Sequence, residues 1–169
     1  MTASRAILLL LTVATVLMLQ HYYPQMPDPM AAHFDGSGRP NGYQSRDGFF
    51  LLAGAIVLLV VVIFAFVGLL FRAVPTHLVN LPNRDYWLAP ERRASTIEFM
   101  THQMEWFGVG TMILLVSVLW LAMEANLTPD PTLDPSTMWW LLGAYFVFSA
   151  LWLIHFVGKF RSARETDGS

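Results

Sequence analysis

The chain has 169 residues, of which 55% are hydrophobic and only 13% are charged. Soluble globular domains carry about 25% charged residues, so this composition excludes an ordinary water-soluble particle. The high apolar content and the net charge of -2 also exclude intrinsic disorder. The balance of 10 Lys+Arg against 12 Asp+Glu excludes the basic field of a nucleic-acid-binding protein. Cysteine is absent, so no disulfide bond or thiolate metal site is expected.

Four apolar blocks predict transmembrane helices, at about 6–23, 49–71, 106–123 and 138–158. A bilayer core about 30 Å thick needs about 20 apolar residues in a helix, and backbone amides in lipid must bond within their own segment. We therefore expect an all-α integral membrane protein, a four-helix transmembrane bundle with a small irregular Pro/Gly-rich outer cap. The first block has an alternative interpretation as a cleaved signal peptide, although residues 20–24 contain no small-x-small cleavage site.

The distribution of Lys and Arg predicts the orientation of the bundle. Eight of these residues lie in the N-terminal tail, the 72–105 loop and the tail after 158, whereas two lie in the first loop and none in the 124–137 loop. Because cytoplasmic loops carry the excess of Lys and Arg, both termini are predicted to be cytoplasmic. The expected location is the bacterial inner (plasma) membrane, as a multi-pass protein.

The expected organisation has four parts. A first unit, residues 1–72, contains two helices joined by the outer loop 24–48. A cytoplasmic loop with an amphipathic helix, residues 73–105, leads to the second helical pair, 106–158. A cytoplasmic tail follows at 159–169.

The outer loop holds the most distinctive sequence of the chain. Its prolines keep the chain out of a helix, residues 30–34 form a short extended run, and 35–38 and 40–42 carry turn signals. These features predict an ordered cap on the membrane surface. His33 and Asp35, with Asp28, form one candidate site for zinc or manganese. The alternative is that His33 and Asp35 bond backbone groups in a tight turn.

The order of residues in this loop resembles the domain of unknown function 1648 (DUF1648), which is typical of SdpI-like membrane proteins. The match rests on Pro27, His33, Phe34, Gly38, Pro40, Asn41, Gly42 and Tyr43, and these residues with Asp35 are the candidate outer binding surface. The resemblance implies immunity to a secreted killing factor and signalling to a cytoplasmic repressor. An Arg-Thr-Pro-Trp-type loop, usual in the second half of SdpI-like proteins, is not found in this chain.

The cytoplasmic loop carries a second motif, Asn-Leu-Pro-Asn-Arg-Asp-Tyr-Trp-Leu at 80–88, which looks like a companion motif of the same family. It is an extended, Pro-punctuated segment followed by a helix that begins near Pro90 and is expected to run into the third span. The candidate residues for binding a cytoplasmic partner are Asn80, Pro82, Asn83, Arg84, Asp85, Tyr86, Trp87, Arg92 and Arg93.

On that helix, Glu98, His102 and Glu105 have the spacing of one helical face. This stripe is a candidate divalent-metal site or proton relay, and the alternative is a solvated face of an amphipathic helix. No catalytic residue is assigned, because the sequence has no nucleophile elbow, His-Glu-x-x-His motif or phosphate loop.

Together these patterns favour a non-enzymatic, SdpI-like protein of the lipid bilayer that binds an extracellular peptide or protein and a cytoplasmic regulatory protein. No cofactor and no nucleic acid are expected. One alternative is a small membrane enzyme or metal-binding protein that uses a divalent metal. Another is a transporter or channel subunit that works as a homo-oligomer.

Overall fold

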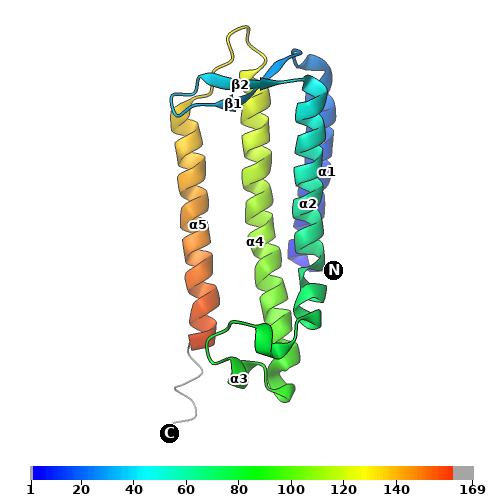
Figure 1. Ribbon diagram of the computed structural model, residues 1–169, viewed down its shortest axis with the longest axis vertical. Coiled ribbons are helices and arrows are strands. Elements are labelled where there is room, and N and C mark those ends of the chain that lie inside the picture. The colour runs from blue at the N-terminus through cyan, green and yellow to red at the C-terminus, as the bar shows by residue number, and fades with distance from the viewer. Residues whose placement is uncertain (1, 162–169) are drawn as a thin grey trace.

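The computed structural model describes residues 2–161 of the chain as four long helices and one β-hairpin (Figure 1). The elements in chain order are α1 Ala3–Tyr22, the 3-10 turn η1 Tyr23–Gln25, β1 Met30–Phe34, β2 Pro40–Gln44, α2 Arg46–Ala73, the 3-10 turn η2 Thr76–Leu78, α3 Arg84–Trp87, α4 Pro90–Ala125 and α5 Pro135–Arg161. The helices α1, α2, α4 and α5 are long and apolar enough to cross a membrane. The predicted all-α, four-helix membrane fold is confirmed.

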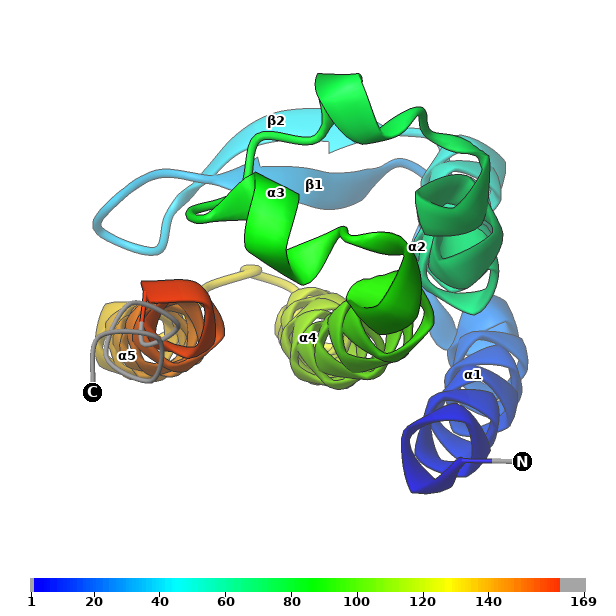
Figure 2. The same ribbon diagram turned by 90° about the horizontal axis from the view of Figure 1, so that it is seen from below.

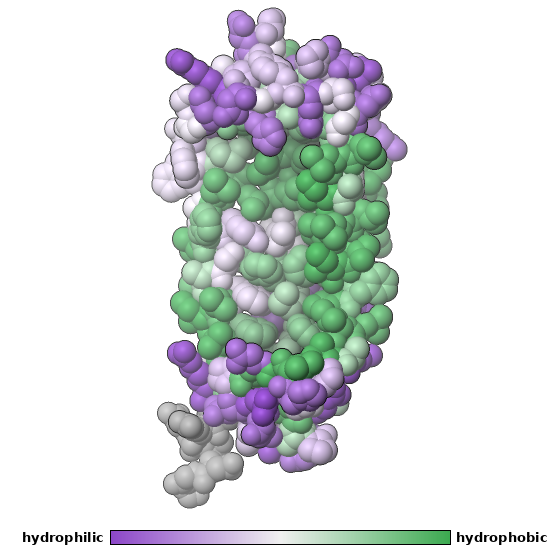
Figure 3. Space-filling view, in the orientation of Figure 1, coloured by the Kyte–Doolittle hydropathy of each residue, from purple (hydrophilic) through white to green (hydrophobic). Residues whose placement is uncertain are grey.

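The two ends of the bundle differ in what caps them. The segment 74–89 and the end of α5 lie at one end, named here the loop end, and α1 begins in the half of the bundle nearer to this end (Figure 1). The hairpin and the α4–α5 connection 126–134 lie at the opposite end, named the hairpin end. Polar residues gather at both ends and apolar residues cover most of the side between them (Figure 3). Arg164 and the rest of the predicted tail beyond residue 161 lie outside the described residues.

Polar side chains cap the starts of α2 and α5. The Ser45 hydroxyl accepts a hydrogen bond from the Gly48 N–H at the start of α2 (3.2 Å). The Asp134 carboxylate accepts hydrogen bonds from the N–H groups of Ser136 and Thr137 at the start of α5. These bonds satisfy N–H groups that have no partner within the helix.

The predicted third span, residues 106–123, is the C-terminal part of a single helix, α4, that begins at Pro90, as the sequence predicts. Its 36 residues give a length of roughly 54 Å at about 1.5 Å per residue, which exceeds a hydrocarbon core of about 30 Å. The helix α4 therefore extends beyond the membrane core.

The buried core lies between α1, α2 and α4 and continues under the hairpin. Its members include Leu8, Met26, Met30, Phe49, Ala53, Val57, Phe64, Val109, Met112, Leu119, Ala122 and Met123. A Cβ on Gly108 would lie 2.4 Å from the ring of Phe64. Only glycine therefore permits the close approach of α2 and α4 at this level, as small residues do in membrane helix pairs.

The helix α5 stands outside this core and packs on α4 through a row of aromatic rings. Seen from the loop end, α5 lies on the side of α4 away from α1 (Figure 2). No residue in the apolar 18-residue stretch of α5 is buried. The ring of Phe107 on α4 lies 4.6 Å from that of Trp152 and 5.9 Å from that of Phe148, and the ring of Phe99 on α4 lies 5.7 Å from that of Phe160. Ring stacking holds this helix to the rest of the bundle.

The outer cap has more regular structure than the sequence predicts. The extended run 30–34 is confirmed as β1, but the turn expected at 40–42 is part of the strand β2, which pairs antiparallel with β1. The reversal lies at 35–39, where Asp35 N–H donates to the Arg39 carbonyl (2.8 Å) and Gly38 N–H donates to the Asp35 carbonyl (2.9 Å). Pairing with β1 gives the backbone of 40–44 the hydrogen-bond partners that a local turn would otherwise supply.

Candidate functional site

A recess of about 310 Å³ opens under the hairpin, between β1, the end of α4 and the start of α5. It is lined by Ala32, His33, Phe34, Asp35, Gly36, Gly38, Val118, Ala122, Leu133, Pro135, Met138, Trp139 and Leu142. The walls are mostly apolar, and His33 and Asp35 are their titratable side chains. Small-molecule and side-chain binding sites commonly have this composition, apolar walls with a few polar groups.

The buried amide of Asn126 fastens β1 to the end of α4. Its Oδ1 accepts the N–H of Ala31 (2.7 Å), while its Nδ2 donates to the Ala31 carbonyl (2.9 Å) and to the Ala122 carbonyl (2.8 Å). Ala31 is 0% exposed and Asn126 is 3% exposed. Since water cannot replace these bonds, the amide holds the strand in place above the recess.

A glycine contact fastens the turn of the hairpin to the α4–α5 connection. The Leu133 N–H donates to the Gly38 carbonyl (2.9 Å). Gly38 has φ +81, and a Cβ on it would lie 1.8 Å from the Leu133 carbonyl oxygen. The position therefore requires glycine for its backbone conformation and for the space.

Asp35 builds the turn of the hairpin. Its carboxylate accepts hydrogen bonds from the Ser37 hydroxyl (2.7 Å), the Ser37 N–H (2.8 Å) and the Arg39 N–H (3.0 Å). The Ser37 hydroxyl first, and then the two N–H groups, hold the pKa of Asp35 below its ordinary value. These bonds agree with the turn interpretation of Asp35.

His33 lies on the exposed part of β1, opposite Gly42. A Cβ on Gly42 would be 3.1 Å from the His33 side chain, so the glycine leaves room for the imidazole. Among residues 2–161, no three His, Asp or Glu side chains form a group able to hold a metal ion.

The predicted outer residues thus separate into two sets. His33, Phe34, Asp35 and Gly38 line the recess. Pro27, Pro40, Asn41, Gly42 and Tyr43 do not, and of these Pro27, Asn41 and Tyr43 are exposed.

Acidic side chains dominate the hairpin end. The carboxylates are Asp28, Asp35, Asp47, Glu124, Asp130 and Asp134, and the basic residues are Arg39 and Arg46. Glu124 accepts a hydrogen bond from the Tyr22 hydroxyl, which in turn accepts one from Trp120 Nε1 (3.1 Å). The excess of carboxylates gives this end a negative field that attracts cationic groups.

At the loop end, the predicted motif folds back onto the last turn of α5. The Phe160 carbonyl accepts hydrogen bonds from Asn83 Nδ2 (2.8 Å) and from Trp87 Nε1 (3.2 Å). Asn83 has φ 52, a left-handed conformation that asparagine tolerates better than most residues. The Trp87 carbonyl accepts a bond from the Thr96 hydroxyl on α4 (2.7 Å). Asn83 and Trp87 therefore have a structural role.

The other predicted loop residues divide between internal contacts and exposed positions. The guanidinium of Arg92 lies 3.9 Å from the centre of the Tyr86 ring, and its Nε donates to the Tyr86 carbonyl (2.9 Å). Arg84 pairs with the exposed Asp85 at 3.1 Å. Residues Asn80 and Pro82 are exposed, and Arg93 donates to the Arg72 carbonyl (3.2 Å).

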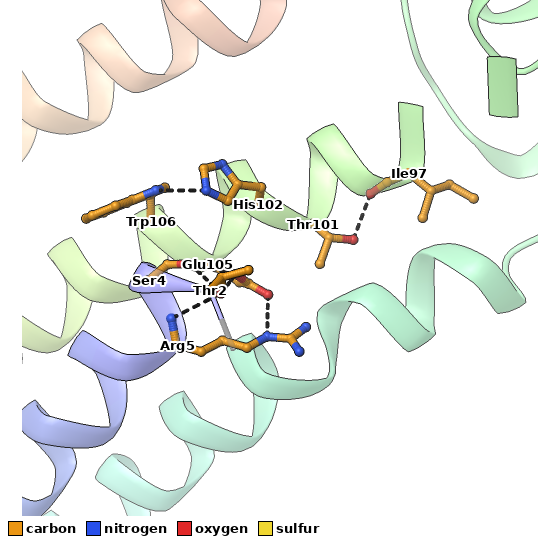
Figure 4. A network of polar contacts seen from close by, with 8 residues as sticks. All are labelled: Thr2, Ser4, Arg5, Ile97, Thr101, His102, Glu105 and Trp106. Atoms are coloured by element: carbon orange, nitrogen blue, oxygen red, sulfur yellow. Dashed lines mark hydrogen bonds and ion pairs between the residues drawn. The ribbon is translucent and has the colours of Figure 1, made fainter. Parts of the chain in front are cut away.

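The stripe on α4 is not held together as one site. Glu105 is 2% exposed and pairs with Arg5 at 2.6 Å. It also accepts hydrogen bonds from the hydroxyls of Ser4 (2.6 Å) and Thr2 (2.9 Å), so it fastens the start of α1 to α4 (Figure 4). His102 accepts a bond from Trp106 Nε1 instead (3.3 Å), and Glu98 is exposed.

Reasoning from the sequence did not find the residues of the recess that come from α4, α5 and their connection. The principal ones are Leu133 and Trp139, which line the recess, and Asn126, which holds β1 above it. A polar residue directly after a long apolar helix was a signal for Asn126, but its partner Ala31 is 95 positions away. The position of Trp139 near a helix end indicated only a membrane-interface aromatic residue.

No curated protein and no solved structure gives a significant match to this chain. One family model does match, over residues 9–57, and its description is domain of unknown function (DUF1648). The matched range includes most of α1, the whole hairpin and the first part of α2. The resemblance of the hairpin motif to this family is thereby confirmed, and residues 9–57 of this four-helix membrane protein are a DUF1648 domain.

Proposed function

We propose that this protein is a non-enzymatic binding protein of the bacterial inner membrane, and that its recess takes an apolar side chain of an extracellular peptide or protein. The observation that supports this proposal is the preformed recess of about 310 Å³ under the hairpin. Asn126 and Gly38 hold the hairpin above it at two separate points. A site held in shape before binding loses little conformational entropy when a ligand enters.

The charge of the two ends supports an orientation with the hairpin end outside. Eight of the Lys and Arg residues belong to the segments of the loop end and its tail, and two belong to the hairpin end. The positive-inside rule then assigns the loop end to the cytoplasm. The excess of carboxylates at the hairpin end favours a ligand with Lys or Arg next to its apolar side chain, because complementary charge speeds association.

The proposed cytoplasmic contact surface is the exposed part of the 76–88 segment. Leu78 is 67% exposed, and Asn80, Pro82 and Asp85 are exposed beside it in sequence. A signalling role of the SdpI-like kind would use these residues, whereas Asn83, Tyr86, Trp87 and Arg92 hold the segment in place. Exposed residues that the fold does not need are the better candidates for partner recognition.

The proposal for the recess is tested with a fluorescein-labelled hexapeptide that carries a lysine on each side of a central leucine. Binding to the purified full chain in detergent is measured by fluorescence anisotropy. The variant Trp139→Ala removes an aromatic wall of the recess, and the expected loss of affinity is about tenfold.

Trp140→Ala is the matched control, because Trp140 is 81% exposed and does not line the recess. Its affinity should stay within about twofold of wild type. A peptide with glutamates in place of the lysines reports binding to the micelle alone. Equal losses in the two tryptophan variants, or equal binding of the two peptides, would contradict the proposal.

The cytoplasmic surface is tested in cells with a photo-crosslinking amino acid at position 78, and with the same amino acid at position 88 as the control. Leu88 is 7% exposed, so its side chain is not accessible to a partner. The expected result is a defined crosslinked product for position 78 that Asp85→Arg weakens. If position 78 gives no product beyond that of position 88, this segment is not the contact surface.

A further inference from the structure

A second cavity lies at the loop end, far from the recess, and arginine side chains line it. This cleft, of about 900 Å³, lies between the start of α1, the end of α2 and the first half of α4. Arg5, Arg72 and Arg93 line it, together with the acidic residues Glu98 and Glu105. It is large enough for a phospholipid headgroup.

Two of the three arginines make no ion pair with a carboxylate within residues 2–161. Arg5 pairs with Glu105 at 2.6 Å, but within residues 2–161 neither Arg72 nor Arg93 forms an ion pair. Arg93 Nη2 donates to the Arg72 main-chain carbonyl (3.2 Å), so the guanidinium of Arg93 lies beside the backbone from which the Arg72 side chain extends. Both arginines line the same cleft, and a guanidinium group that makes no ion pair has N–H donors for a phosphate.

An apolar cleft adjoins the arginine-lined one and shares two residues with it. It has a volume of about 180 Å³ and includes Arg93 and Ile97, which also line the larger cleft. Its other walls include Leu70, Phe71, Val74 and Val79. A charged site and an apolar site thus meet at Arg93.

The location of this pair of clefts matches the membrane boundary. The helix α2 is free of charged side chains from Phe49 to Phe71, and Arg72 is the residue at which its apolar run ends. Lipid headgroups lie at this level of a transmembrane helix, where Arg and Lys are favoured.

We propose that this composite site binds an anionic phospholipid, with its phosphate between Arg72 and Arg93 and part of one acyl chain in the apolar cleft. A free phosphate ester would share the charged contacts. The adjoining apolar cleft favours the lipid, because a free phosphate leaves that cleft unused. This proposal is independent of the function proposed for the recess, which lies at the opposite end of the bundle.

The test uses the full chain, delipidated in detergent, with native mass spectrometry to measure binding of phosphatidylglycerol and of phosphatidylcholine with the same acyl chains. Wild type should prefer phosphatidylglycerol. The double variant Arg72→Gln/Arg93→Gln should weaken phosphatidylglycerol binding by about 25-fold, since each basic residue at a membrane surface contributes about fivefold.

The matched control is Arg84→Gln/Arg161→Gln, which removes the same charge from the same end without touching the clefts. It should change the affinity by less than about threefold. Arg72→Lys/Arg93→Lys keeps the charge and should retain most of the binding, which separates the loss of a binding site from misfolding. Circular dichroism checks the helix content of each variant.

Val79→Phe distinguishes the two sources of phosphate, because it fills the apolar cleft and leaves the arginines in place. Binding of phosphatidylglycerol should fall, while displacement by inorganic phosphate should be unchanged. The proposal is overturned if Arg72→Gln/Arg93→Gln keeps wild-type affinity, if the control pair loses as much, or if phosphatidylcholine binds equally well. Unchanged lipid binding by Val79→Phe with competition by millimolar inorganic phosphate would identify a free-phosphate site instead.

Discussion

The hairpin end and the loop end are both held by an asparagine side chain, but the two asparagines work in different surroundings. Asn126 is buried and makes three hydrogen bonds, two of them to the backbone of one residue, Ala31. Asn83 is partly buried and donates one hydrogen bond, to the Phe160 carbonyl. Asn126 thereby joins the hairpin to the bundle core, whereas Asn83 joins the loop segment to α5, which packs outside that core.

This difference predicts that the two ends differ in rigidity. The hairpin end rests on backbone contacts that tolerate little movement, which suits a recess of fixed shape. At the loop end, the Trp87 side chain donates a hydrogen bond to the Phe160 carbonyl and packs against the Phe160 ring, in the last turn of α5. Segments with few buried contacts open at lower free energy than core elements do. The loop segment is therefore expected to open before the hairpin does when α5 shifts.

The largest expected effect is that of Asn126→Ala, which breaks the fastening of the hairpin. The Ala31 N–H and carbonyl lose their partners in a buried position, and the expected loss of stability is about 2–4 kcal/mol. Hydrogen exchange of the Ala31 amide, followed by mass spectrometry, should accelerate strongly. Asn41→Ala, at an exposed position of β2, is the control and should leave that exchange rate unchanged. Wild-type protection in Asn126→Ala would show that the amide does not hold β1.

Alanine substitutions at two glycines of the hairpin turn test how closely each one packs. Gly38→Ala places a Cβ against the Leu133 carbonyl and strains a left-handed residue, and the expected loss of stability is about 2 kcal/mol or more. Gly36→Ala should be nearly neutral, because a Cβ at Gly36 meets nothing within 4 Å. Thermal unfolding of both variants in the same detergent measures the difference. Equal melting temperatures would contradict the close contact of Gly38 with Leu133.

At the loop end, two variants of Asn83 separate its two roles. Asn83→Gly keeps the left-handed conformation and loses the hydrogen bond to Phe160, at an expected loss of about 1 kcal/mol. Asn83→Ala also strains the backbone, by about 1–2 kcal/mol more. Hydrogen exchange of the 84–88 amides should increase in the order wild type, Asn83→Gly, Asn83→Ala. The same order should not appear at the hairpin, and a matching change there would mean that the two ends are coupled.

The smallest expected effect concerns pH and tests the turn carboxylates of the hairpin end. Hydrogen bonds lower the folded-state pKa of Asp35, first from the Ser37 hydroxyl, and that of Asp134, first from the Thr137 hydroxyl. A lowered folded pKa means that the stabilisation is present above the unfolded value, near 3.8, and is lost as the pH falls through the folded value. The melting temperature should therefore fall as the pH is lowered below about 4.

Asp35→Asn/Asp134→Asn provides the comparison for this pH effect. Because amides do not titrate in this range, the variant should melt lower than wild type at pH 7 and should show a smaller decline in acid. A parallel decline of both proteins would assign the acid sensitivity to other groups.

Much of the fold could be predicted because its causes are local. Long uncharged runs must form helices in lipid, Pro90 suits the first position of a helix, and residues 30–34 were expected to be extended, as β1 is. The strand β2 could not be predicted, because Pro40, Asn41 and Gly42 have turn propensity and become a strand only by pairing with β1.

The candidate site was predicted only in part, for the same reason. The motif on the first outer loop identified His33, Phe34, Asp35 and Gly38, which all line the recess. It contained no information on Leu133 or Trp139, which reach the recess from the other end of the chain. Glu105 was grouped with His102 by helical spacing, but α1 supplies its actual partners, Arg5, Ser4 and Thr2.

The sequence by itself determined the membrane class, the number of long helices and the two motif-bearing connections, because hydropathy and local backbone preference act over short stretches of chain. Only the tertiary structure decided that Asn126 holds β1, that Phe160 receives the inner motif and that Arg72 and Arg93 share a cleft beside apolar walls. Each of these contacts joins residues separated by at least 21 positions. Such contacts depend on how the helices pack, through glycines, aromatic rings and buried amides, and a local pattern does not encode that packing.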